Sequence, residues 1–176
     1  MRIVKVDEME FLLCVKNKVW GSNRSILKTW EEDSLLLFKV GDKVAGLARI
    51  SCDYFESKEI VWDTDLYEHR RCIEFLIIFK KSDRINAEPN IKNIFVNEWG
   101  KSYGHGIINK MRISKKNKEI ILDLLSKKPN SLKYYNKNID NLIKEEKENR
   151  DKEQAMYLKG LLKSSSLKYK KKRINI

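Results

Sequence analysis

The order of apolar and polar residues predicts a β-rich centre for the chain, between residues 34 and 62. An apolar run, Leu35–Phe38, is followed by a turn at Gly41-Asp42 and by a second run, Val44–Ile50. Two such runs joined by a glycine-containing turn are typical of a β-hairpin. The unbroken run LLLF suits a strand that is buried on both faces. Gly46, inside the second run, predicts a sharp bend or the close approach of another backbone.

Compact apolar runs elsewhere predict further strands. We expect strands at residues 10–16 (EFLLCVK), 72–80 (CIEFLIIFK), 94–96 and 107–113. The segment 72–80 is the most hydrophobic of these and should lie at the centre of the sheet. The polar or glycine-rich segments 51–59, 80–93 and 97–106 are expected to be loops.

Apolar residues at helical spacing predict two helices in the first three-quarters of the chain. Ser22 or Asn23 can cap a helix through RSILKTWEE, in which Trp30 is expected to be a core residue. The segment NKEIILDLLSKK, residues 117–128, has a single apolar face and predicts an amphipathic helix.

The composition changes at Pro129. From Ser131 onward the chain is rich in lysine, asparagine and glutamate, and its ending, SSSLKYKKKRINI, is basic without an acid. This pattern predicts two parts: a folded domain over residues 1–128, and a charged helical extension with a basic linker or tail over residues 129–176. A solvated tail is favoured over a dedicated binding arm. A third alternative is that the chain is the front part of a longer protein, cut inside a linker.

Composition narrows the class of protein. The chain has 176 residues, of which 41% are hydrophobic, as in ordinary globular domains. Its formal net charge of +12 favours nucleic acid or an anionic membrane surface as a partner. No run is long enough to cross a membrane and the N-terminus does not resemble a signal peptide, so we expect a cytoplasmic protein that binds no membrane. Cys14, Cys52 and Cys72 are odd in number, widely spaced and expected to be reduced and buried.

Little in the sequence predicts catalysis. The two histidines, His69 and His105, do not have a metal-ligand spacing, and no glycine-rich phosphate loop or hydrolase elbow occurs. Asp63 and Asp65 are close in sequence, but this spacing is more typical of turn chemistry than of a catalytic pair. We therefore expect no enzyme activity, no cofactor and no metal. The alternative, an enzyme, would depend on His69 or His105 for turnover.

Aromatic residues interleaved with basic ones are typical of proteins that bind single-stranded or flipped-out bases. Stacking of a base on an aromatic side chain contributes about 1–3 kcal/mol. Trp20 and Trp62 both stand at the ends of predicted strands, where we expect them to be open to solvent and to face each other across a slot. The alternative for either tryptophan is core packing. The expected contacts to phosphates come from eight basic residues: Arg24, Lys28, Arg49, Arg70, Arg71, Lys101, Lys110 and Arg112.

The sequence resembles the YTH and EVE domains of the PUA-like superfamily. The resemblance is carried by FLLCVKNKVWGSNRSILKTW, SLLLFKVGDKVAGLARIS and IVWDTDLYEHRRCIEF, in this order, over roughly residues 10–125. Within them, Trp20-Gly21-Ser22, Ala45–Arg49 and Trp62 match motifs of YTH domains. WDTDLYEHR is similar to an EVE-type motif, with Glu68 in place of a proline, and FVNEWGK resembles the piece before the last YTH strands. The resemblance implies an α+β fold: a curved mixed β-barrel with flanking helices and a C-terminal helical extension.

The resemblance also implies a function. In YTH domains the matching tryptophans form a cage around N6-methyladenine, which would make Trp20 and Trp62 the walls of a base site. Gly21 and Ser22 would contact the edge of the base, and Asn17 and Asp63 are further base-binding candidates. The segment before VWGS is shorter than in YTH domains that bind methylated bases.

The same fold occurs as the N-terminal DNA-recognition domain of archaeal McrB-type restriction GTPases. We therefore expect a module that binds DNA, flips out a modified base and works with a GTPase motor and a nuclease subunit. The first alternative is an RNA-binding PUA-like domain for tRNA, rRNA or methylated RNA. A second alternative, a scaffold that binds protein through its charged helix, predicts no salt-sensitive binding of nucleic acid.

Overall fold

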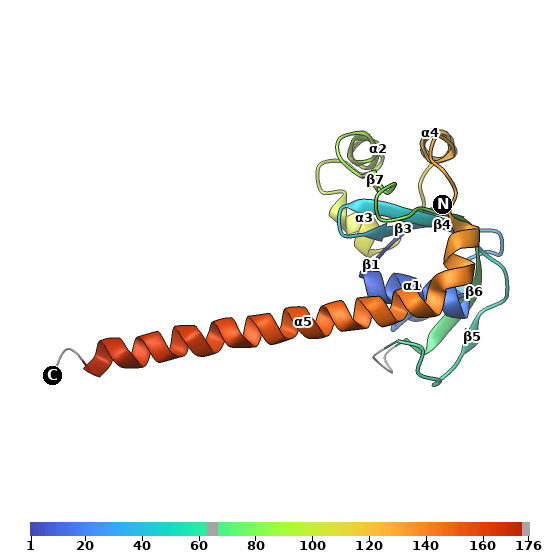
Figure 1. Ribbon diagram of the computed structural model, residues 1–176. Coiled ribbons are helices and arrows are strands. Elements are labelled where there is room, and N and C mark those ends of the chain that lie inside the picture. The colour runs from blue at the N-terminus through green and yellow to red at the C-terminus, as the bar shows by residue number, and fades with distance from the viewer. Residues whose placement is uncertain (63–66, 174–176) are drawn as a thin grey trace. The chain divides into compact units, whose positions relative to one another are not determined.

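The computed structural model of the protein describes residues 1–62 and 67–173, and for Asn90 and residues 162–173 it describes the backbone only (Figure 1). The chain forms two compact units, Met1–Ile139 and Asp140–Ile176. The boundary expected after residue 128 falls in the turn between the last two helices. Each unit is considered by itself below.

A single mixed β-sheet organises the first unit. In the described part of the chain its strands are β1 (Arg2–Val6), β2 (Val19–Ser22), β3 (Leu35–Val40), β4 (Lys43–Ile50), β5 (Phe55–Glu56), β6 (His69–Ile78) and β7 (Ile85–Asn86). The strand order is β1-β3-β4-β6-β2, with β5 paired to β6 and β7 paired to β4. Strand β1 runs parallel to β3, and the other pairs are antiparallel. The sheet curls into a half-barrel with flanking helices, which confirms the predicted α+β fold class.

Helices cover both faces of this sheet. The helices of the described chain are α1 (Glu8–Asn17), the 3₁₀ helix η1 (Ser25–Thr29), α2 (Asn90–Trp99), α3 (Gly104–Ile108), α4 (Lys115–Ser126) and α5 (Leu132–Arg173). Helices α2 and α4 lie on one face and α1 lies on the other (Figure 1). Helix α1 begins with a capping box: the Asp7 side chain accepts from the Glu10 amide at 2.8 Å, and the Glu10 side chain accepts from the Asp7 amide at 2.9 Å.

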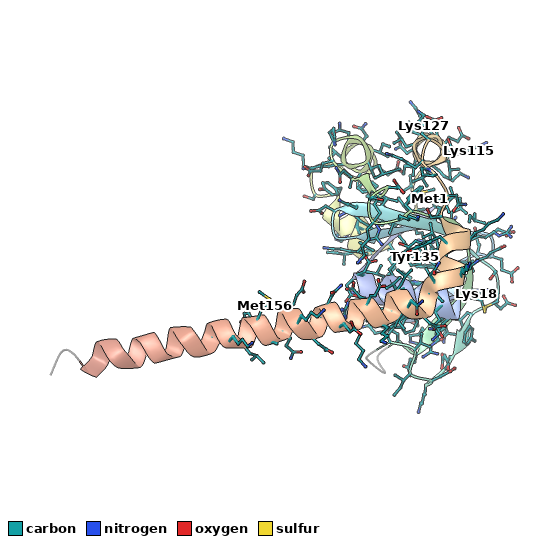
Figure 2. The ribbon with its side chains drawn as sticks, viewed as in Figure 1. Met1, Lys18, Lys115, Lys127, Tyr135 and Met156 are labelled. Atoms are coloured by element: carbon teal, nitrogen blue, oxygen red, sulfur yellow. A yellow bond between two sulfur atoms is a disulfide. The ribbon has the colours of Figure 1, made fainter. Side chains whose placement is uncertain are left out.

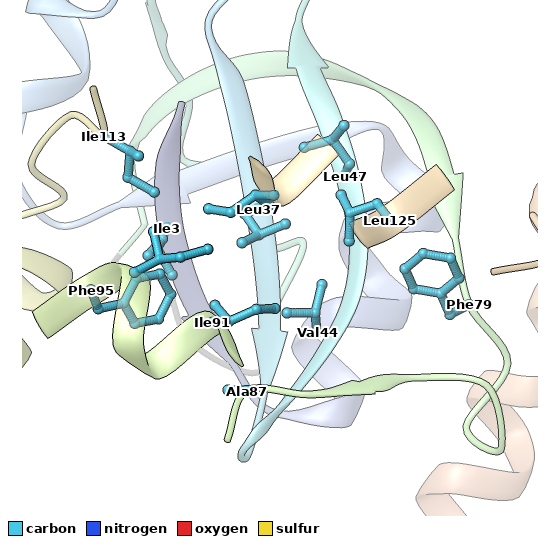
Figure 3. Close-up of a cluster of buried hydrophobic side chains, with 12 residues drawn as sticks. Ile3, Leu37, Val44, Leu47, Phe79, Ala87, Ile91, Phe95, Ile113 and Leu125 are labelled. Atoms are coloured by element: carbon cyan, nitrogen blue, oxygen red, sulfur yellow. The ribbon is translucent and has the colours of Figure 1, made fainter. Parts of the chain in front are cut away.

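The hydrophobic core explains why the run LLLF is apolar throughout. Leu37 points to one face, where a cluster of buried side chains joins the sheet to α2 and α4 (Figure 3). Its buried members are Ile3, Leu37, Val44, Leu47, Phe79, Ala87, Ile91, Ile94, Phe95, Ile113, Ile121 and Leu125. Phe38 is also buried, and it packs on Phe11 of α1 with ring centroids 5.8 Å apart. A strand that is apolar on both faces therefore lies between two layers of helices, as the run predicted.

The hairpin β3–β4, the long strand β6 and helix α4 confirm three predictions made from apolar patterning. Gly46 confirms a fourth. A Cβ atom built at Gly46 would lie 2.7 Å from the backbone oxygen of Ile77, so another backbone does approach closely at this position.

Several other sequence predictions are wrong. The segment 10–16 belongs to helix α1, because a short apolar run fits a buried helix as well as a strand. The segments 94–96 and 107–113 lie in α2, in α3 and in the chain that follows, and the expected loop 80–93 contains β7 and the start of α2. Strand β1 was not predicted.

The cysteines were expected to be reduced, but Cys52 and Cys72 form a disulfide. Although 20 positions separate them in sequence, the sheet brings their Cα atoms to 5.2 Å. The amide of Ser51, at the end of β4, donates to the carbonyl of Cys72 in β6 at 3.0 Å. Cys14 is free and buried.

Helix α5 runs through both units, beyond the point where a linker or tail was expected to begin. In the first unit, Tyr135, labelled in Figure 2, is buried and donates its hydroxyl hydrogen to the Phe79 carbonyl at 3.2 Å. In the second unit the described side chains are mostly charged and exposed, and Met156 is 73% exposed. Over the described residues, no helix combines the length and the apolar character needed to span a bilayer.

Candidate nucleic-acid interface

A pocket of about 300 Å³ lies beside β2 and contains both tryptophans singled out from the sequence. Strand β2 contributes Trp20, Gly21 and Ser22, and the segment before β6 contributes Trp62 and Tyr67. The other lining residues come from β1, α1 and α3 and from the residues that follow β2 and α3: Ile3, Lys5, Val6, Glu10, Asn23, Ile107, Ile108 and Lys110. The pocket therefore combines aromatic, aliphatic and charged side chains from parts of the chain that are distant in sequence.

Trp20 lies in the middle of β2, opposite Arg71 of β6. The residue is 8% exposed, and its indole meets the Phe38 ring edge-on, with centroids 5.9 Å apart and an interplanar angle of 89°. Its indole Nε1 is buried and has no hydrogen-bond partner among the described residues.

Trp62, in the segment before β6, lines the same pocket. It is 3% exposed, and the Tyr67 ring packs on it edge-on at 5.3 Å. The Arg70 guanidinium carbon lies 5.5 Å from its ring centroid. The expectation that both tryptophans are open to solvent is thus wrong, because each residue is more than nine-tenths buried and packs on neighbouring side chains. What the structure does bring together is both rings at one pocket.

Gly21 makes this arrangement possible. A Cβ atom at this position would lie 2.7 Å from Cη2 of Trp62 and 3.0 Å from Cβ of Tyr67. Only a residue without a side chain lets the Trp62 indole lie directly against strand β2.

Ser22 follows Gly21 in the pocket wall and is also buried. Its hydroxyl oxygen accepts from the amide of Arg24 at 3.2 Å, which fixes the chain as it leaves β2.

The indole of Trp62 also contacts Cys14 of α1. Burial raises the pKa of the Cys14 thiol, and a hydrogen bond with the Trp62 side chain acts in the opposite direction. Since the indole N–H is the only polar group of this side chain, it is the donor. Trp62 therefore offers ring surface rather than a polar group to the pocket.

Glu10 and Tyr67 are site residues that the sequence interpretation did not identify. One Glu10 carboxylate oxygen caps α1, and the other accepts from the Tyr67 hydroxyl at 3.3 Å. Burial, followed by the nearby Glu10 charge, raises the pKa of Tyr67. Because residues 10–16 were expected to form a strand, the sequence did not predict that the Glu10 side chain points into the pocket. The capping-box pattern, an aspartate followed three residues later by a glutamate, was the signal for a helix start.

One predicted base-binding residue, Asn17, is not found at this pocket. Asn17 lies at the end of α1, donates its side-chain amide to the Leu13 carbonyl at 2.9 Å, and lines a different pocket. Its assignment to the base site is wrong, because the segment is a helix whose last turn points elsewhere. Asp63 lies outside the described residues.

The eight expected phosphate contacts divide into four groups, of which the buried pair Arg70 and Arg71 is described last. Lys110 lines the pocket, and its pKa is lowered by burial first and by the charge of Arg24 second. Arg24 and Lys101 are exposed. The other exposed or half-exposed cations are paired with acids: Lys28 with Glu56 at 3.3 Å, Arg49 with Glu74 at 2.5 Å and Arg112 with Glu31 at 2.7 Å.

The prediction of phosphate contacts is wrong for Arg70 and Arg71. Both are 4% exposed. Arg70 donates to the carbonyls of Tyr67 and Glu59, and Arg71 donates to those of Leu27, Trp30 and Cys52, among others. Their guanidinium groups hold loops to strand β6 and are not available to phosphates.

The comparisons with known proteins agree with this architecture. No family model matches the sequence, and no curated protein matches it. Among solved structures, the chain is similar to the YTH domain-containing protein mmi1 in its RNA complex, with 14% identity and a TM-score of 0.52. The match covers 70% of this chain and 79% of that one. The fold is YTH-like.

Two further YTH domains match the same share of the chain, 70%. One is that of Zygosaccharomyces rouxii MRB1 in complex with N6-methyladenosine RNA, with 16% identity, a TM-score of 0.45 and 84% of its chain covered. The other is the Pho92 YTH domain in complex with m6A, with 14% identity, a TM-score of 0.48 and 81% covered. At 14% identity the likeness to the mmi1 structure describes the fold alone, and the roles of individual residues stay predictions.

Proposed function

We propose that this protein binds nucleic acid and holds one base in the pocket beside β2. The observation that carries the proposal is that Trp20 and Trp62 line one pocket of about 300 Å³ together with Lys5 and Lys110. Aromatic surface for a base and cations for its phosphates are thus present at one place, as single-strand binding requires. The pocket volume is at the lower end of the range that is usual for small-ligand sites.

The lining favours a modified base. Besides the two indoles, Ile107 and Ile108 of α3 contribute aliphatic surface. A methyl group on the base would bury additional apolar area, worth about 0.8 kcal/mol for one carbon. We therefore propose a methylated base as the preferred occupant.

Glu10 supplies the polar contact. A carboxylate can only accept hydrogen bonds, and a base edge that carries an exocyclic amino group can donate one. Adenine, cytosine and guanine carry such a group and keep at least one N–H after a single methylation. We therefore propose that the occupant is an amino base, held with its amino group toward Glu10.

RNA is the better-supported nucleic acid. The solved structure with a TM-score of 0.52 is a complex with RNA, whereas DNA was the first expectation from the sequence. A base in duplex DNA would also have to be flipped out at a cost of a few kcal/mol, which a single strand avoids. The McrB-type interpretation, with its GTPase and nuclease partners, stays a prediction from sequence resemblance.

Fluorescence anisotropy with nine-nucleotide oligomers tests this function. We would compare RNA and DNA of one sequence in which the central base is adenine, N6-methyladenine, cytosine or 5-methylcytosine. We expect single-stranded RNA with a methylated amino base to bind most tightly. Equal affinity for all oligomers would contradict a base pocket and leave only a polycation.

A pair of exposed residues offers a matched test of the pocket itself. Ala substitutions of Trp20 or Trp62 would remove core contacts, whereas Ile108 and Met111 are 65% and 42% exposed. Ile108→Glu places a carboxylate at the pocket, and Met111→Glu adds the same charge nearby but outside it. We expect Ile108→Glu to weaken binding at least ten-fold more than Met111→Glu. Equal effects would contradict base binding at this pocket.

A further inference from the structure

A second pocket, of about 560 Å³, lies in the first unit between the end of α1, strand β6 and the start of α5. It shares no lining residue with the proposed base pocket. Its lining residues are Val15, Asn17, Lys18, Ser51, Cys72, Ile73, Glu74, Phe75, Leu132 and Asn136. Lys18 is labelled in Figure 2. Four consecutive residues of one strand, Cys72–Phe75, thus form part of the wall.

Strand β6 is longer than its neighbour on this side. Strand β2 pairs only with His69–Cys72. Just past this pairing, the Ile73 amide donates a hydrogen bond to the carbonyl of Lys18, the residue before β2, at 2.9 Å. On its opposite side, β6 continues to pair with β4 as far as Ile78. From Ile73 onward, one edge of β6 therefore has no neighbouring strand within the described part of the chain.

The direction of the backbone groups follows from the alternation in an antiparallel sheet. The amide and carbonyl of Ile50 bond toward β3, to Ser34 and Asp33, each at 3.0 Å. Ala48, two residues earlier on the same strand, also turns its backbone groups toward β3. Since Ala48 lies opposite Phe75, the N–H and C=O of Phe75 point away from β4 and toward the pocket side.

Other residues limit the length of this unpaired edge at both ends. At one end lies Lys18. At the other, the Asn130 side chain donates to the Leu76 carbonyl at 2.8 Å and accepts from the Ile78 amide at 3.2 Å. At about 3.3 Å per residue, the gap has room for about three residues of an extended chain. The edge of a second copy of this protein, which is longer, does not fit into such a gap.

The charge at the pocket is positive. The Glu74 carboxylate is paired with Arg49 at 2.5 Å, whereas Lys18 is exposed and has no ion pair within the described residues. A ligand that carries a carboxylate near Lys18 is therefore favoured over one that carries a cation.

We propose that this pocket binds an extended acidic peptide segment of another protein by strand addition to β6. The peptide backbone exchanges hydrogen bonds with Phe75 and with the carbonyl of Ile73, and its carboxylate pairs with Lys18. A nucleic acid could also contact Lys18, but it has no donors and acceptors at the spacing of a strand. The proposal is independent of the base pocket and of its ligand.

The test uses the full chain and a defined peptide, Ac-Glu-Val-Thr-Val-Glu-NH₂. Its β-branched residues favour an extended backbone, and a carboxylate at either end can reach Lys18 in either strand direction. In an NMR titration of the ¹⁵N-labelled protein, we expect shifts at the amides of Lys18 and Ile73–Phe75 and none at Trp20. In the free protein the Phe75 amide should exchange with solvent faster than that of Glu74, and the peptide should slow it.

Matched peptides and variants complete the test. Two peptides are compared, one N-methylated at the central threonine and one at a neighbouring valine. We expect one of them to lose binding and the other to bind like the parent peptide, because only alternate residues turn their N–H toward the edge of β6. The peptide with terminal lysines should bind at least five-fold more weakly. Asn136→Trp, which fills the pocket, should abolish binding, and the exposed Lys137→Trp, which does not line it, should leave binding unchanged. Absence of shifts at β6, insensitivity to both N-methylations, or displacement of the same amide signals by a single-stranded oligonucleotide would overturn the proposal.

Discussion

Arg71 is the side chain whose role departs furthest from what its charge suggests. Its guanidinium donates to the carbonyls of Leu27 and Cys52 at 3.1 Å and to that of Trp30 at 2.5 Å. Arg71→Met would leave these buried oxygens without donors, so we expect the free energy of unfolding to fall by about 3 kcal/mol. Arg71→Lys should cost less but not restore stability, because an ammonium cannot reproduce the planar fork. Urea denaturation measures both, and a loss below about 1 kcal/mol for Arg71→Met would contradict this role.

Gly21 offers a test of the pocket wall. Gly21→Ala places a methyl group against Trp62, so the indole has to move, and overpacking of this kind costs about 1–3 kcal/mol. We expect a shift in tryptophan fluorescence and weaker binding of the preferred oligomer. Gly104→Ala is the control, because a Cβ atom there meets nothing within 4 Å. If both variants bind like the parent, the position of Trp62 does not matter for binding.

Protonation of Lys110 should make the affinity of the pocket for nucleic acid depend on pH. Its pKa is lowered, first by burial and then by Arg24, so the native protein loses this proton at a lower pH than the unfolded chain does. A bound phosphate favours the ammonium form, so affinity should fall as the pH rises through the lowered pKa, below the ordinary lysine value of about 10.4.

The variant Lys110→Met separates binding from stability. It should lack this part of the pH dependence and bind several-fold more weakly at pH 7. It should not lower the melting temperature on electrostatic grounds, because the folded state no longer holds a partly buried charge. Anisotropy from pH 7 to 10 and thermal unfolding measure the two effects. An unchanged pH profile would mean that Lys110 does not contact the phosphate.

At the same scale, the sequence could indicate Trp20 and Trp62 but not their surroundings. The two tryptophans follow from short motifs in a fixed order, which is local information. Tyr67 reaches Glu10 across 57 positions of the chain, so that contact depends on the finished fold. The burial of Arg71 was missed for the same reason, since its acceptors lie 19 to 44 positions away.

The spacing of apolar residues predicted helices and strands correctly where its period was unambiguous. The hairpin β3–β4 has a glycine turn between two apolar runs, and α4 has one apolar face, so both were predicted. Helix α1 was taken for a strand because its apolar run is short and buried on most sides. The segment 94–96 failed in the same way, as a part of α2 that faces the core.

The link between β4 and β6 can be tested through its disulfide. Cys52 and Cys72 close a loop over a sequence separation of 20, and such a crosslink stabilises a protein by about 3 kcal/mol. We expect one thiol, that of Cys14, to react in denaturant without reductant, and three after reduction. Reduction should lower the free energy of unfolding by about 3 kcal/mol. Three reactive thiols before reduction would show that the cysteines are free, as the sequence alone suggested.

The whole molecule carries a net charge of +12, but its cations are not equivalent. In the first unit Arg70 and Arg71 are buried, and Lys28, Arg49 and Arg112 are paired with acids. In the sequence of the second unit, every charged residue after Glu153 is basic. This run of basic residues belongs to a part of the sequence outside the unit that contains the base pocket, so charge and base recognition should be separable.

Truncation after Glu153 tests this separation. A cationic segment neutralises phosphates without regard to sequence, so its removal should weaken the binding of every oligomer. For single strands, the slope of log affinity against log salt should become shallower by about 0.7 for each phosphate that the shortened chain no longer neutralises. The ratio of affinities for methylated and unmethylated RNA should stay the same, because the pocket lies within Met1–Ile139. A chain with Lys170, Lys171 and Lys172 replaced by glutamine keeps its length and should show part of the same change. If truncation instead alters the methylation ratio, the second unit takes part in selecting the base.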